Sequence, residues 1–161
     1  MAAGYRFEET VTMPRYMWAA IMGGMVGLLA GLMAPLPGGR TGRKAWLTTR
    51  GPRLAGVVVL ALATLTFRRL KTVVDDDRVK FGFGVLGQSL PLGSIQACEV
   101  KKYNPLLFGG WGIRLSWGGR RAYSMLGAPR GVEITVARDK KARRYFVSST
   151  QPELLASALS R

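Results

Sequence analysis

The chain has 161 residues, which is enough for one small domain and a membrane anchor. It carries a formal net charge of +15, contains no histidine and has a single cysteine, Cys98. These counts argue against Ser-His or Cys-His catalysis, His-ligated metal or haem, and a disulfide framework. We therefore expect no enzyme activity, no catalytic residue, no cofactor and no metal site, and we interpret Cys98 as a small buried residue in a strand.

A long apolar run follows the polar segment 1–15. Residues 16–36 carry no charge and, as a helix, are long enough to cross a bilayer, so we predict a first transmembrane helix here. Small residues recur in it at four-residue spacing: Gly23, Gly27 and Gly31. Such spacing places them on one side of the helix, where another helix can approach closely, so we predict a helix-packing interface. The alternative is the general enrichment of glycine in membrane helices.

A second apolar run follows a basic connector, residues 37–53. Leu54 to Phe67 has no charge but as a helix would be only about 21 Å long, short of the ~30 Å hydrocarbon core. We favour a second transmembrane helix over residues 54–69, because two helices make a simple hairpin anchor. The alternatives are a single span, with this run forming a buried β-hairpin or an interfacial segment, since it is rich in Val and Thr.

The basic residues near the spans predict the topology. The connector carries five Lys or Arg, whereas the segments flanking the hairpin on the other side carry seven. The positive-inside rule then places both termini in the cytoplasm. We expect the protein in the inner (cytoplasmic) cell membrane, with its C-terminal domain on the cytoplasmic side; the single-span model predicts the same side for that domain.

From Leu70 onward, short apolar runs alternate with turn residues, which predicts strands about ten residues apart. The expected strands are 70–74, 78–83, 86–92, 95–103, 111–117, 121–126, 131–137 and 142–148. The acidic stretch 75–77 is interpreted as a turn, and the glycine pattern 82–87 as a β-turn, because no helix follows to hold a pyrophosphate. The pattern is typical of a small barrel or sandwich.

The last residues predict one amphipathic helix, residues 151–160. Thr150 and Glu153 have the spacing of a capping box, in which each side chain satisfies a free amide at the helix start. Leu154, Leu155 and Leu159 would form its apolar face against the strands. The fold class is therefore a membrane-anchored α+β protein: a transmembrane helix or helical hairpin, then a β domain of about seven strands, residues 70–161, closed by this helix.

The β domain resembles the pleckstrin-homology-like (PH-like) domain of bacterial membrane proteins that carry an N-terminal transmembrane hairpin. The similarity covers about residues 5–160 and follows the order and spacing of these blocks: Val73–Gly82, Pro91–Ile95, Gly109–Arg114, Ala122–Tyr123, Gly131–Ile134 and Thr150–Leu154. The block Gly109–Arg114, with sequence GGWGIR, is the most specific of them. The resemblance implies a PH-like barrel and a membrane location, and it implies no reaction.

Two surfaces are candidates for contact with partners. The first is basic: Arg68, Arg69, Lys71, Arg138, Lys140, Lys141, Arg143 and Arg144. Its charge favours an acidic protein face or anionic headgroups. The second is an apolar loop: Leu106, Leu107, Phe108 and Trp111. This loop either folds back onto the barrel or inserts into a membrane or partner, and we expect Trp111 to be its buried member.

We expect a non-enzymatic accessory, assembly or stabilising subunit of a larger membrane complex, whose partners are other membrane protein subunits and anionic lipids. The alternative is a membrane-surface sensor or adaptor that binds anionic lipid. Nucleic acid is not expected, because no nucleic-acid-binding motif is visible. No small-molecule substrate is expected.

Overall fold

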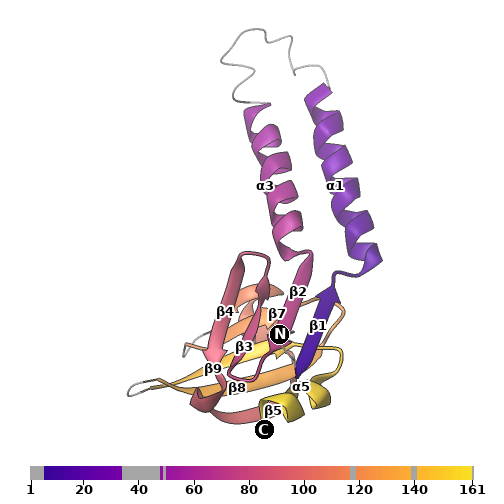
Figure 1. The fold of residues 1–161 in the computed structure, drawn as a ribbon. Helices are drawn as coiled ribbons and strands as arrows, with labels where there is room; N and C mark the ends of the chain where they lie inside the picture. The colour runs from indigo at the N-terminus through magenta and orange to yellow at the C-terminus, as the bar shows by residue number, and fades with distance from the viewer. Residues whose placement is uncertain (1–5, 34–47, 49, 117–118, 139–140, 161) are drawn as a thin grey trace. The chain divides into compact units, whose positions relative to one another are not determined.

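The computed structural model describes residues 6–33, 48, 50–116, 119–138 and 141–160 (Figure 1). The chain forms two compact units. One is a helical unit, Pro14–Thr66, and the other is a β domain made of Met1–Met13 and Phe67–Arg161. The β domain therefore begins with the N-terminal segment and not at residue 70.

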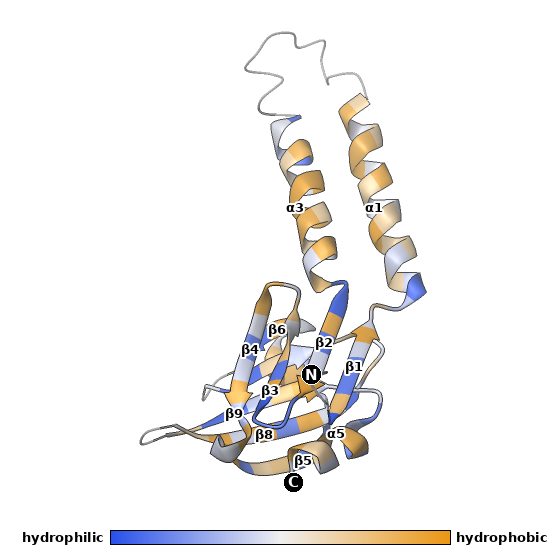
Figure 2. Ribbon diagram, viewed as in Figure 1, coloured by the Kyte–Doolittle hydropathy of each residue, from blue (hydrophilic) through white to orange (hydrophobic). Residues whose placement is uncertain are grey.

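The helical unit contains α1, Arg15–Met33, and α3, Gly51–Phe67. Both are predominantly apolar, as their orange colour in Figure 2 shows. By length and composition α1 is long enough to cross a membrane, whereas α3 is shorter, at 17 residues. Because 54–67 is helical, the alternative of a β-hairpin for this run is wrong. Residues 34–47, most of the predicted connector, lie outside the described residues.

One close contact and one hydrogen bond join α1 and α3. Leu28 of α1 approaches Gly56 of α3, where a Cβ would lie 3.7 Å from Leu28 Cδ1. Arg53 donates from Nη1 to the carbonyl of Gly31, one of the last carbonyls of α1, which lack a partner within the helix.

Thr64, the one buried residue of α3, donates to the carbonyl of Leu60 at 2.6 Å. An apolar helix can therefore carry this hydroxyl without leaving it unpaired.

The first sheet has four antiparallel strands in the order β1-β2-β3-β4 (Figure 1). Their bounds are Phe7–Thr12, Arg69–Val74, Arg78–Phe83 and Leu86–Pro91. Alternate residues of β2 and β3 face the core, which is the period-two pattern of a half-buried sheet. Strand β1 was not predicted, because only Val11 of its six residues is buried and its polar sequence shows little periodicity.

The second sheet has five strands in the order β5-β8-β9-β7-β6. Their bounds, in chain order, are Ile95–Lys102, Gly112–Leu115, Arg121–Ser124, Arg130–Arg138 and Lys141–Ser148. Strand β7 pairs with β9 in parallel, and the other pairs are antiparallel. A short 3-10 helix, Leu92–Ser94, precedes β5, and a short helix α4, Pro105–Phe108, follows it. All eight predicted strands form, and none of their ends differs from the predicted one by more than two residues.

The two sheets share one hydrophobic core. Phe81 of the first sheet contacts two rings of the second: its ring centroid lies 5.0 Å from that of Tyr123 and 6.0 Å from that of Tyr145. Across the described residues the strands form two separate sheets and no closed barrel. The α+β class is therefore confirmed, and of the two predicted forms of the β domain, barrel or sandwich, the barrel is wrong. The chain instead follows the layered arrangement of two sheets around a common core.

The C-terminal helix α5, Pro152–Leu159, packs on this core through Leu155 and Leu159, which are both buried. Leu154 is exposed, so the predicted three-leucine face is correct for two of its members. The capping box is wrong. The cap position is Gln151, and Thr150 instead donates from both its amide and its hydroxyl to the carboxylate of Glu9 on β1.

Candidate functional site

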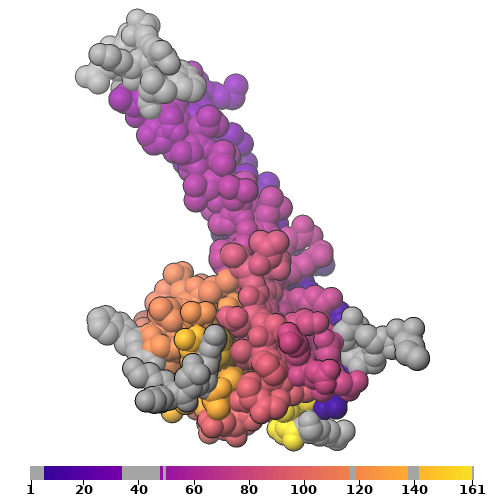
Figure 3. All heavy atoms as spheres, turned by 60° about the vertical axis from the view of Figure 1, so that its left-hand side comes forward, coloured from indigo at the N-terminus to yellow at the C-terminus, as the bar shows by residue number. Residues whose placement is uncertain are grey.

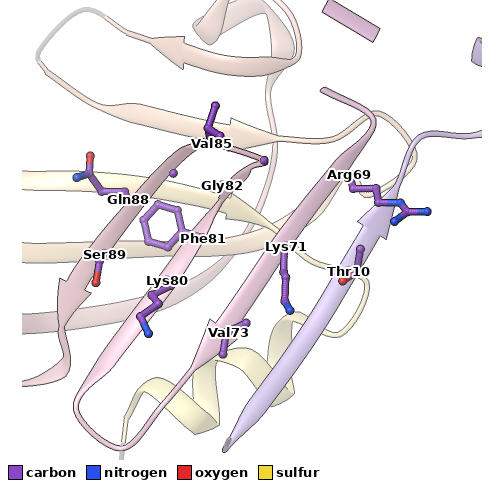
Figure 4. Close-up of a pocket in the computed structure, with 12 residues that line it drawn as sticks. Thr10, Arg69, Lys71, Val73, Lys80, Phe81, Gly82, Val85, Gln88 and Ser89 are labelled. Carbon is purple, nitrogen blue, oxygen red and sulfur yellow. The ribbon is translucent and has the colours of Figure 1, made fainter. Parts of the chain in front are cut away.

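A shallow hollow of about 850 Å³ lies on the outer face of the first sheet (Figure 4). The register explains it. One row of cross-strand neighbours runs Thr10, Lys71, Gly82 and Gly87, and the next runs Glu8, Val73, Lys80 and Ser89. The first row ends in two glycines, so no side chain covers the sheet there. The hollow is therefore floored by backbone and walled by side chains of the neighbouring row.

The two glycines of the floor are held close together. A Cβ at Gly82 would lie 2.2 Å from Gly87 Cα and 2.5 Å from the Leu86 carbonyl oxygen. Real Cβ atoms do not approach backbone this closely, so only glycine fits at Gly82. The glycine pattern 82–87 is thus a tight β3–β4 hairpin, as predicted, with Gly84 at its tip at a positive φ of 55°.

The cations around the hollow are largely paired. Lys71 Nζ lies 2.7 Å from Glu8 Oε1, and Lys80 Nζ lies 2.8 Å from Asp75 Oδ2. Arg69 is exposed and has no carboxylate within 4 Å among the described residues. The hollow therefore offers one unneutralised guanidinium and several hydrogen-bonding groups.

The structure separates the predicted basic surface into two parts. Arg69 and Lys71 lie on the outer face of β2, directly after Arg68, which is exposed. Arg143 and Arg144 are exposed on β9, in the other sheet. Arg138 pairs with Lys141 across the end of the β8–β9 hairpin, and Lys140 lies outside the described residues. The sequence showed these charges but not that two sheets divide them.

Lys101 on β5 joins two carboxylates that face each other across the strands. Its Nζ lies 2.6 Å from Glu133 Oε1 and 2.7 Å from Glu99 Oε2. Hydrogen bonds to Glu133 and then to Glu99 raise the pKa of Lys101. The hydrogen bond and charge of Lys101 in turn lower the pKa of Glu99. Because Glu99 and Glu133 are register partners, Lys101 also screens a pair of like charges.

We predict that Lys101→Met lowers stability most near neutral pH. A lowered carboxyl pKa stabilises the fold above the ordinary carboxyl pKa of about 4.3, and this contribution is lost as pH falls through the folded-state pKa. The raised pKa of Lys101 stabilises the fold below about 10.4 and is lost at higher pH. Melting temperatures of wild type and variant in non-ionic detergent should therefore differ most near pH 7 and converge as the pH falls below 4. Lys102→Met, one residue along, should show no such convergence.

The three glycines of the predicted helix-packing face of α1 differ in their surroundings. Gly31 lies against Arg53, whose Nε would be 3.5 Å from a Cβ added at Gly31. Gly23 and Gly27 have nothing within 4 Å of such a Cβ. Four residues advance an α-helix by about 40° beyond a full turn, so the row turns gradually away from α3 toward its N-terminal end. Gly23 and Gly27 thus belong to a face that is open within the helical unit.

The apolar loop is half packed and half exposed. Phe108 stacks on the buried Tyr103 with ring centroids 5.3 Å apart, and Tyr103 in turn contacts Phe146. Leu106, Leu107 and Trp111 are exposed. The expectation that Trp111 is buried is therefore wrong, because Phe108 takes that place. Asn104 accepts a hydrogen bond from the Leu106 amide at 3.0 Å and so caps the short helix α4 that presents the two leucines.

No grouping in the described chain has the ligands of a metal site. Cys98 lies on β5 and is half-buried; burial raises the pKa of its thiol, which disfavours the reactive thiolate. No family model, curated protein or solved structure matches the chain. Three surfaces of the molecule remain as candidates for function: the open face of α1, the hollow and the apolar loop.

Proposed function

We propose that this protein is a non-enzymatic, membrane-anchored accessory subunit that acts by contact within a larger membrane complex. The observation that carries the proposal is the open face of α1. This 19-residue apolar helix has no buried residue, and one exposed strip along it consists of small residues: Ala20, Gly23, Gly27 and Ala30. Lipid gains little from such a face, whereas a second helix can approach its backbone closely.

The β domain adds a second means of contact. Its outer sheet face carries Arg69 beside a backbone-floored hollow, and β9 exposes Arg143 and Arg144. These cations favour an acidic surface of a partner subunit. The location that fits this arrangement is the inner membrane with the β domain in the cytoplasm, and the PH-like resemblance is consistent with it. The alternative function, binding of anionic lipid, uses the same cations.

The proposal predicts that Gly27→Leu abolishes most association with partner proteins. The new side chain would keep a partner helix from the α1 backbone, while Gly27 contacts nothing within the protein that the change could disturb. The measurement is co-purification of the tagged full-length protein from membranes under mild detergent, comparing wild type and variant by composition and native mass.

Ala55→Leu is the matched control, because Ala55 is exposed on α3 and adds similar bulk elsewhere. It should retain the partners. If the wild-type protein itself runs as a monomer with no partner under gentle extraction, the accessory-subunit proposal is wrong, and anionic-lipid binding becomes the better explanation.

A further inference from the structure

One end of the β domain gathers the points where the chain enters and leaves it. At this end, called the rim below, β1 finishes at Thr12 opposite Arg69, the first residue of β2, and β3 finishes at Phe83 opposite Leu86. The amide of Met13 donates to the carbonyl of Arg68 at 3.2 Å, so the segment that leaves β1 lies beside the segment that enters β2. The two connections between the β domain and the helices therefore both start from the rim.

The second sheet contributes its apolar loop to the same rim. The ring of Phe67 lies 5.2 Å from that of Phe83, measured between centroids. On its other side, Phe67 Cε1 would be 3.5 Å from a Cβ at Gly112, the residue after Trp111. Phe67 thus joins the β3–β4 turn to the loop that carries α4. In Figure 3 the rose atoms of β3–β4 and the orange atoms of the β6–β7 region both reach the surface of the β domain.

Large apolar side chains project from the rim into solvent. Val85, at the tip of the β3–β4 turn, is 96% exposed, and Leu106 on α4 is 91% exposed. Leu86, Leu107 and Trp111 are exposed beside them. Elsewhere in the first sheet the apolar residues point mainly into the core. The exposed apolar side chains at the rim therefore differ from the single apolar residues that are scattered over most protein surfaces. Figure 2 shows the apolar colour at the start of β4.

Charge is distributed unevenly along the first sheet. Its acidic residues all lie in the half remote from the rim, near Phe7 and the β2–β3 turn: Glu8, Glu9, Asp75, Asp76 and Asp77. The rim end of the same sheet carries Arg68 and Arg69. A surface with apolar tips and cations, and with its carboxylates kept away, is complementary to the boundary between acyl chains and anionic headgroups.

We infer that the rim is a membrane-docking surface, which inserts Val85 and Leu106 into the acyl–headgroup boundary of the bilayer that holds the helices. The inference rests on the proposed membrane anchor and adds to it a seat for the β domain. The connections are short: two residues, Met13 and Pro14, separate the end of β1 from α1, and one residue, Arg68, separates α3 from β2. At about 3.5 Å per step, the three Cα–Cα steps of the longer connection reach ~10 Å at most, about the thickness of the headgroup region. The rim is thus tethered within reach of the lipid.

The test uses the full-length protein with Cys98→Ser and one new cysteine labelled with bimane, reconstituted in vesicles of phosphatidylcholine and phosphatidylglycerol. Some of the phosphatidylcholine carries a doxyl quencher near the top of its acyl chain. The rim probes are Val85→Cys and Leu106→Cys. The control is Asp77→Cys, exposed at the opposite end of the first sheet, and Val26→Cys reports on α1 itself.

The rim probes and the α1 probe should lose most of their fluorescence to the lipid quencher, and the Asp77 probe should keep its own. If the α1 probe is quenched but both rim probes stay as bright as the Asp77 probe, the docking surface is wrong and the anchor stands; the tips are then available to a protein partner. Equal quenching at Asp77 would also overturn it, since the contact would not belong to the rim. If the α1 probe stays bright, the membrane anchor itself fails, and the docking surface fails with it.

Discussion

Leu155→Asp should unfold the β domain at temperatures where the wild-type protein is folded. Leu155 is fully buried, and it lies in the core that both sheets share. The substitution removes a buried leucine, which alone costs about 2–5 kcal/mol, and it adds a carboxylate that must be buried without a partner or be protonated. A domain of this size is stable by only about 5–15 kcal/mol, so the loss is a large part of the total.

The matched control for this change is Leu154→Asp. Leu154 is the preceding residue on the same helix, but it is 59% exposed. A surface substitution of this kind changes stability by about 0.5 kcal/mol or less. The measurement is the melting temperature of each variant by circular dichroism in non-ionic detergent. Wild-type melting of Leu155→Asp would show that α5 is not docked on the core.

Gly82→Ala should disrupt the β3–β4 hairpin even though it adds only one methyl group. The Cβ would lie 2.2 Å from Gly87 Cα, and the atoms in its way belong to the backbone of the neighbouring strand. A backbone cannot move aside as the end of a flexible side chain can, so the strands must separate or the pairing must shift. We expect a cost of about 3 kcal/mol, at the upper end of the usual range for overpacking.

Gly93→Ala is the control, because a Cβ at Gly93 meets nothing within 4 Å and its φ lies outside the left-handed region. It should be neutral or slightly stabilising, by up to about 1 kcal/mol. The comparison uses melting temperature together with amide hydrogen exchange, which should accelerate in β4 of Gly82→Ala. Wild-type stability in that variant would mean that the two strands do not approach as closely as described, and that the hollow lacks its backbone floor.

The hollow and the rim could be predicted from the sequence only in part. The motif 82–87 was correctly interpreted as a hairpin, because its glycines precede no helix and follow a strand pattern. That it floors a hollow depends on the register that pairs Gly82 with Gly87, which local sequence does not reveal. Likewise, the leucines of the 106–111 loop were candidates from sequence, but the structure alone shows that Phe67 packs between this loop, at Gly112, and the end of β3, at Phe83, two residues before Val85.

The sequence by itself determined the local elements: two apolar helices, eight strands and the amphipathic C-terminal helix. Apolar periodicity and turn residues act within a few residues, so they can be recognised along the chain. The tertiary structure decided what depends on distant partners. Polar β1 becomes a strand because β2 offers it an edge, and Thr150 bonds Glu9, 141 residues away, in place of the helix end. Phe108 takes the buried place expected of Trp111 because it stacks on the ring of the buried Tyr103. Each of these outcomes is set by which residues meet in space, and that is determined only once the two sheets close on their common core.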